Sequence, residues 1–141
     1  MRAMTVLLAL CSCVSLSVVP AASPEDAILA AREIIGQQIQ AFLNDDPATA
    51  YAFASPAIRE KFPTEAGFFD MVRRQYAPVY HPGNFAFGRA RQDGGMILQE
   101  VLISGPDGKD WTALYQLLRQ PDDSYRINAM HLVPAAPGPD I

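Results

Sequence analysis

The spacing of apolar residues changes near the middle of this chain of 141 residues. In the first half, apolar side chains recur at helical spacing, at Ile28, Ala31, Ile35, Ile39 and Phe42. Such spacing places them along one side of a helix. From about residue 78 onward, aromatic and branched residues gather in short runs separated by turn residues, as is typical of strands. The change predicts helices in the first half and a sheet in the second.

Helix starts in the first half are marked by side-chain oxygens. Ser23, Asp46 and Ser55 each stand directly before a proline, and Thr64 stands before a glutamate. Such an oxygen accepts a hydrogen bond from a free amide of the first helical turn, and proline suits the first helical position. We therefore expect Ser55 to be an N-cap and not a nucleophile, since the strand-to-helix elbow of a G-x-S-x-G site is missing. Asp45 is expected to be a loop residue, not half of a catalytic carboxylate pair.

Turn signals divide the second half into four strands. The turns at residues 93–95, 105–108 and 121–124 are built from Asp, Gly, Pro and Ser. Connections this short join successive strands as hairpins, which predicts a four-stranded antiparallel meander. Helices followed by such a sheet make an α+β fold with the helices packed on one face of the sheet. We expect a single domain over residues 23–134 and a disordered, proline-rich tail over residues 135–141.

The second face of the expected sheet is also rich in apolar residues. Leu98, Leu102, Leu114 and Leu118 fall on the face opposite to that of Tyr115. The predicted helices are sufficient to cover one face only. Since exposed apolar surface favours association, we expect a homodimer through the open face of the sheet.

The N-terminus has the order of regions found in a secretory signal peptide. Arg2 is followed by an apolar run over about residues 6–19 and then by the small residues Ala21 and Ala22. We expect residues 1–22 to be removed and the protein to be exported, to the periplasm or as a secreted protein.

Both cysteines of the chain, Cys11 and Cys13, lie in this N-terminal segment. Its removal would leave a mature chain without a disulfide, a thiol nucleophile or a cysteine metal ligand. The alternative is a lipoprotein anchored at Cys13, because the run LCSC loosely resembles a lipoprotein box.

The charge of the chain argues against several classes of partner. The net charge is -4, and removal of Arg2 leaves ten basic residues against fifteen acidic ones, a net charge of -5. Nucleic acids and anionic membranes attract concentrated positive charge, so neither is expected as a partner. No membrane span is expected in the mature chain. With two histidines and no clustered carboxylates, we expect no metal and no cofactor.

Four short runs resemble a known family. They are AFLNDD at residues 41–46, AYAFASP at 50–56, FDMV at 69–72 and YAPVY at 76–80. These runs are similar to the exported bacterial proteins of domain of unknown function 4864, within the nuclear transport factor 2-like (cystatin-like) superfamily. The resemblance implies a cone of helices packed on a curved antiparallel sheet, which encloses a pocket. It implies no established activity.

The superfamily includes enzymes such as ketosteroid isomerase, scytalone dehydratase and limonene epoxide hydrolase, which place acid and base groups in an apolar pocket. The corresponding candidates for ligand binding here are Tyr76, Tyr80, His81, Tyr115 and His131, with Asp70 as a further acid. None of them lies in a motif that matches a catalytic residue of those enzymes, so no catalytic residue is assigned.

The histidines and the aromatic segment before the first strand also have plain structural interpretations. His81 stands before Pro82 in a loop, and His131 is expected at the opposite edge of the sheet, which argues against a histidine pair. Residues 76–87 are expected to form a stiff, extended approach to the first strand.

Two functions from different classes remain open. The first is a non-catalytic module that binds a small apolar ligand or a protein partner. The second is a cofactor-free isomerase, dehydratase or hydrolase that uses Tyr, His and Asp groups in the pocket. The missing catalytic motif favours the binding module, because a fold alone does not define a function.

Overall fold

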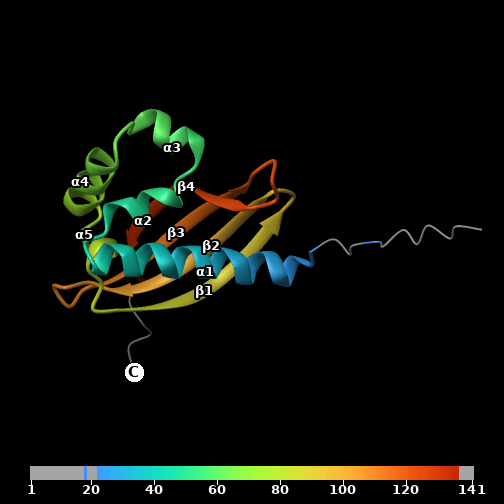
Figure 1. Cartoon of the computed structure of the whole chain (residues 1–141). Coiled ribbons are helices and arrows are strands. Elements are labelled where there is room, and N and C mark those ends of the chain that lie inside the picture. Colours follow the sequence, from blue (N-terminus) through green and yellow to red (C-terminus); the bar gives the residue numbers. More distant parts are fainter. Residues whose placement is uncertain (1–17, 19–21, 137–141) are drawn as a thin grey trace, which may run out of the picture.

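The computed structural model describes residue 18 and residues 22–136 of the chain (Figure 1). The expectations for the signal peptide, for Cys11 and Cys13 and for the tail beyond Ala136 fall on residues outside this part. The elements, in chain order, are α1 (Pro24–Leu43), α2 (Pro47–Ala52), α3 (Pro56–Lys61), α4 (Glu65–Gln75), α5 (Ala77–Tyr80), β1 (Asn84–Asp93), β2 (Met96–Ser104), β3 (Asp110–Arg119) and β4 (Tyr125–Pro134).

The first four helices begin at the capping residues that the sequence predicted. Ser23, Asp46, Ser55 and Thr64 each accept, through a side-chain oxygen, a hydrogen bond from the amide three residues further on. At α1 the carboxylate of Asp26 also accepts from the Ser23 amide, which completes a capping box. The prediction that Ser55 is an N-cap is confirmed.

The fifth helix was not expected. Residues 77–80 form one helical turn, so the prediction of a wholly extended approach to β1 was wrong. The amides of Val79 and Tyr80 both donate to the carbonyl of Tyr76, at 2.9 and 3.0 Å. The turn places Val79, which is almost fully buried, in the core. Burial of this side chain favours the turn over an extended path.

The sheet is a four-stranded antiparallel meander in the order β1-β2-β3-β4, as predicted. Helix α1 runs along one face of the sheet, and the shorter helices gather on the same side (Figure 1). The α+β architecture predicted from the sequence is confirmed. Between the layers lies a core whose largest fully buried side chains include Tyr115, Phe42, Ile35, Ile39 and Ile97.

The pairing of β1 with β2 is interrupted by a bulge. Their register shifts between Phe87 and Ala90, so Gly88 and Arg89 lie where the regular ladder is broken. A bulge frees backbone groups from their ladder partners and requires other partners for them.

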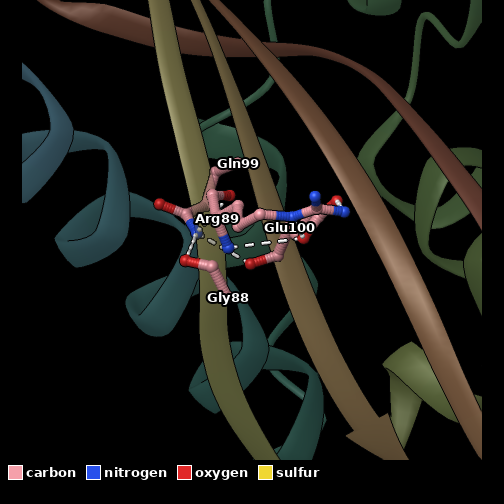
Figure 2. Close-up of polar contacts among 4 residues, drawn as sticks. All are labelled: Gly88, Arg89, Gln99 and Glu100. Atoms are coloured by element: carbon pink, nitrogen blue, oxygen red, sulfur yellow. Dashed lines mark hydrogen bonds and ion pairs between the residues drawn. The ribbon is translucent and has the colours of Figure 1, made fainter.

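Gln99, on β2, supplies those partners from a fully buried position. Its side-chain nitrogen lies 3.2 Å from the carbonyl oxygen of Gly88, 3.3 Å from that of Arg89 and 2.7 Å from that of Glu100. Its side-chain oxygen accepts from Nε of Arg32 on α1, at 2.9 Å. Figure 2 shows the amide between the two strands, beside the ion pair of Arg89 with Glu100. One side chain thus joins the bulge to the helix layer.

The sheet face away from the helices carries exposed apolar residues among polar ones, which include the ion pair of Arg89 with Glu100. Leu102, Leu114 and Val133 are 48%, 36% and 50% exposed, and the register places them on the face opposite to the buried Tyr115. We call this surface the outer face. Among the helices of the described residues, none is both long and apolar enough to cross a bilayer.

Candidate functional site

A cavity of about 250 Å³ lies between the helices and the last two strands. Its walls come from α1, α3, α4, α5, β3 and β4, and they are mostly apolar. The apolar side chains around it include Phe42, Ile58, Phe62, Phe68, Met71, Val72, Val79, Ile127 and Met130. A water molecule occupies about 30 Å³ in the liquid, so the cavity has room for roughly eight groups of that size. This is the volume of a small ligand.

Few polar side chains line this cavity, and they differ in burial. Gln38 is 3% exposed, and its amide nitrogen donates to the carbonyl of Ala50 at 3.1 Å. Tyr115 lies on the sheet side and Tyr76 at the end of α4. Lys61 and Gln75 are exposed residues of the lining. Asn128, on β4, is a further polar residue of the lining. Gln38 and Tyr115 are thus buried, whereas Lys61 and Gln75 are exposed and mark the side that we call the mouth.

Tyr115 is the unusual group of this site. Its side chain is 1% exposed, and its hydroxyl has no hydrogen-bond partner among the described residues. Burial raises the pKa of this hydroxyl, so it stays protonated and is available as a donor. A buried polar group without a partner costs about 1–3 kcal/mol. Tyr115 is one of the residues that line the cavity, and its hydroxyl has almost no accessible surface. A bound molecule would provide the missing partner where it brings an acceptor atom into contact with this hydroxyl.

Tyr80 and His81 belong to a different cluster at the surface. The hydroxyl of Tyr80 donates to the carboxylate of Asp45, and Nε2 of His81 lies 3.3 Å from the same oxygen. The rings of Tyr80 and His81 are stacked, with centroids 3.9 Å apart. Nε2 of His81 also lies 3.2 Å from the carbonyl oxygen of Phe42, the last buried residue of α1. We call Asp45, Tyr80 and His81 the Asp45 cluster.

The charge of Asp45 is stabilised within this cluster. The hydrogen bond from Tyr80 is the largest cause that holds the pKa of Asp45 below its ordinary value of 3.8, and the charge of His81 acts in the same direction. The same hydrogen bond raises the pKa of Tyr80. Asp45 has φ of 51°, a left-handed conformation that aspartate tolerates better than most residues. Asp45 is a loop residue, as predicted, but the sequence did not indicate its two partners.

The remaining candidates lie apart from the cavity. His131 is exposed on β4, opposite Leu114 on the outer face. Asp70 is paired with Arg73 and Arg74 on the surface of α4, at 2.8 and 2.9 Å. In the described part of the chain, no group of three or more potential metal ligands is found. Of the residues named from the sequence, Tyr76 and Tyr115 are the ones brought together at the cavity.

The sequence patterns did not identify Gln38, Gln99 or Lys61 as residues of a site or of a buried network. For the two glutamines a signal was present, because Gln38 falls between Ile35 and Phe42 on the buried side of α1, and Gln99 falls in the same register as the buried residues of β2. A polar residue at a position that the period assigns to the core indicates a buried hydrogen-bond network. Lys61 carries no such signal, since it ends a short helix at the surface.

Comparison with known proteins places these features in a family. The sequence profile of the family described as "Domain of unknown function (DUF4864)" matches residues 24–139. This span includes every helix and strand described above. No curated protein matches the chain in sequence.

Solved structures with a similar fold are also proteins of unknown function. An NTF-2 like protein from Silicibacter pomeroyi is 12% identical, with a TM-score of 0.58 over 81% of this chain and 100% of that one. An NTF2-like protein from Shewanella baltica is 13% identical, with a TM-score of 0.57 over 82% of this chain and 100% of that one. At such low identity the likeness shows the fold alone.

Proposed function

Because the chain belongs to the DUF4864 family and has a lined cavity within an NTF2-like fold, we propose that it is a non-catalytic module that binds a small, largely apolar ligand. The ligand occupies the cavity between the helices and β3 and β4. Its apolar part contacts the aromatic and aliphatic walls, as in most small-molecule sites.

The observation that carries this proposal is the buried hydroxyl of Tyr115. Nearly all buried polar groups in proteins have a hydrogen-bond partner, so an orphan beside a cavity favours an external one. The hydroxyl is a donor, and the ligand supplies an acceptor such as a carbonyl or ether oxygen. Any further amide or hydroxyl group of the ligand that became buried without a hydrogen-bond partner would lower the affinity. A ligand with one acceptor on an apolar body therefore matches the cavity best.

The alternative function, a cofactor-free isomerase, dehydratase or hydrolase, lacks support from the geometry. Such chemistry needs an acid and a base within hydrogen-bond reach of the substrate. Asp70 is engaged by two arginines on the surface, and His131 lies on the outer face. Tyr115 has no acid–base partner within the part of the chain described. The arrangement favours binding over turnover.

The test is an NMR titration of the protein with methyl hexyl ketone, a neutral molecule with one acceptor. We expect saturable shifts at residues of α4 and β4 around the cavity, and weaker binding by about threefold to tenfold in Tyr115→Phe. Tyr125→Phe is the matched control, because Tyr125 is also buried on the sheet but does not line the cavity. Shifts confined to the outer face, or equal affinity in both variants, would overturn the proposal.

We further propose that two copies associate through the outer face. Four strands spaced about 4.8 Å apart, three of 10 residues and one of 9, present a face of roughly 600 Å². Two such faces bury roughly 1,200 Å², the lower limit for a stable interface. The exposed Leu102, Leu114 and Val133 supply apolar area for it.

Export of the protein is also proposed, on the pattern of residues 1–22 alone. The order of a basic residue, an apolar run and small residues supports cleavage after Ala21 or Ala22. The mass of the protein isolated from its own cells tests this. A mass that includes Met1 would contradict it, and a lipid attached to Cys13 would identify the anchored alternative.

A further inference from the structure

We infer that the ligand of this cavity carries a negatively charged end, which pairs with Lys61 at the mouth. The inference rests on the proposed function, since it assigns the chemical class of the ligand in the same cavity. The ligand would be a small amphiphile, with a carboxylate at the mouth, an apolar body and an acceptor at the buried end.

Lys61 is the one cationic residue that lines the cavity within the described residues. It ends α3, and its ammonium lies 5.7 Å from the ring centre of Phe62, a second lining residue. The charge therefore lies beside the apolar wall of the cavity. A ligand whose body contacts Phe62 would bring its end group close to this ammonium.

Lys61 is also free of a competing ion pair. No carboxylate of the described residues lies within 4.0 Å of its ammonium, whereas Arg73, Arg74 and Arg89 each have such a partner. An incoming anion would thus gain a partner without displacing one. Gln75, the other exposed polar residue of the lining, offers a neutral amide and no repulsion.

The polar groups of the cavity then match the two ends of one molecule. The hydroxyl of Tyr115 is buried and Lys61 is exposed, so an acceptor suits the first position and an anion the second. A charged end that stays at the mouth keeps much of its hydration, which avoids the cost of burying a charge. The apolar body between them occupies the volume of about eight water-sized groups.

The experiment compares two ligands that differ at one end. The first ligand is methyl hexyl ketone. The second, an acetylhexanoate with the acetyl group on the terminal carbon, has a carboxylate in place of the methyl group at the far end of the chain. Calorimetric titration at low salt is expected to show about threefold to fivefold tighter binding of the acid, the range for a partly exposed ion pair. At about 1 M salt, where the Debye length falls to about 3 Å, this preference is expected to disappear.

The matched variants are Lys61→Gln and Lys109→Gln. Lys109, the other lysine of the chain, lies between β2 and β3 and does not line the cavity. The preference for the acid, measured in each variant relative to its own affinity for the ketone, is expected to persist in Lys109→Gln and to vanish in Lys61→Gln. Loss of the preference in both variants alike would overturn the inference, because it would reflect the net charge alone.

The two proposals fail in different ways. If the wild-type protein binds both ligands with equal affinity, the inference about Lys61 is wrong and the proposed function stands. If neither ligand binds, both are wrong.

Discussion

The buried side-chain amide of Gln99 is expected to contribute strongly to the stability of the protein. In Gln99→Leu, Nε of Arg32 would lose its acceptor and the carbonyl of Arg89 would lose its side-chain donor, whereas the carbonyl of Gly88 keeps the bond from Nη2 of Arg32 at 3.3 Å. Since each buried group left unpaired costs about 1–3 kcal/mol, we expect the free energy of unfolding to fall by about 2–4 kcal/mol. Urea denaturation measures this change.

A glutamine on the surface provides the control for that substitution. Gln37 is exposed on α1, and Gln37→Leu is expected to change the free energy of unfolding by less than about 0.5 kcal/mol. Similar losses in the two variants would show that the bulge does not depend on the amide of Gln99.

The Asp45 cluster predicts a dependence of stability on pH. The pKa of Asp45 is lowered in the folded protein, first by the hydrogen bond from Tyr80 and also by the charge of His81. Its contribution to stability is therefore present above the ordinary pKa of 3.8 and is lost as the pH falls through the lower, folded value. We expect the difference in melting temperature between wild type and Asp45→Asn to be largest near neutral pH and to shrink below about pH 4.

Asparagine is a suitable replacement at this position because it also tolerates positive φ. The other carboxylates with lowered pKa, such as Asp46 and Asp122, are the same in both proteins, and their effects cancel. When Tyr80 is replaced by Phe in both proteins, the difference in melting temperature between the protein with Asp45 and its Asp45→Asn variant should be smaller, because the hydrogen bond from Tyr80 is the largest cause of the lowered pKa of Asp45. A difference that does not vary with pH would contradict the assignment.

For single residues, the sequence predicted which side chains are buried better than it predicted their hydrogen-bond partners. The period of α1 and β2 identifies the buried sides of both elements, yet it treats Gln38 and Gln99 as exceptions. Their partners come from distant parts of the chain, a carbonyl of α2 and a bulge in β1. The unpaired hydroxyl of Tyr115 likewise depends on packing between layers, which no local pattern records.

Among the elements, α3 begins at a residue with two roles. Oγ of Ser55 accepts from the amide of Ile58 at 3.3 Å and donates to Oδ1 of Asn128, on β4, at 2.9 Å. Ser55 is 2% exposed, whereas Thr64, the cap of α4, is exposed, and its side chain makes only the capping bond to Gly67 within the described residues. We expect Ser55→Ala to lower the free energy of unfolding by about 2–3 kcal/mol and Thr64→Ala by about 1 kcal/mol.

Chemical denaturation of the two variants measures both losses. The threonine variant serves as the control for the loss of a cap alone. Equal losses would mean that the contact between Ser55 and Asn128 adds nothing to stability.

The presence of a side-chain cap also explains which helices could be predicted from the sequence. The starts of α1 to α4 each carry a side-chain oxygen, and these starts were confirmed. Helix α5 has Tyr76 as its N-cap without a side-chain hydrogen bond, contains Pro78 and is followed by Pro82, and the sequence indicated extended backbone there. Burial of Val79 decided the conformation, and burial in a tertiary core is not encoded locally.

At the scale of the whole molecule, the outer face predicts association. We expect wild-type protein to sediment as a dimer at micromolar concentration and Leu114→Glu to sediment as a monomer, because the new carboxylate would lie beside Glu100, its cross-strand neighbour, and would be costly to bury. Analytical ultracentrifugation measures the mass directly. Leu29→Glu is the control, since Leu29 is 61% exposed on α1, away from the sheet.

A wild-type monomer would contradict the dimer and leave the cavity proposal intact. The cavity is enclosed by residues of one chain, so ligand binding and association are independent measurements.

The architecture of the molecule as a whole followed from the sequence, because a meander and a helix layer depend on local turns and periods. The volume and the polar groups of the cavity could not be predicted from local turns and periods. The resemblance to a family implied a pocket, but its volume and its polar ends depend on how α3 and α4 stand over the sheet. That placement is fixed by contacts between distant segments.

The two edges of the sheet have one further consequence, for aggregation. On β4, Ile127 exchanges backbone hydrogen bonds with Phe53 and Ser55, at 2.8 and 2.9 Å, and on β1 the bulge interrupts the ladder beside Arg89. A free, regular edge is a template on which strands from other molecules add to form amyloid-like fibrils. Here one edge is partly occupied by the chain itself and the other is kinked and charged. Both features hinder the strand-by-strand addition by which such fibrils grow.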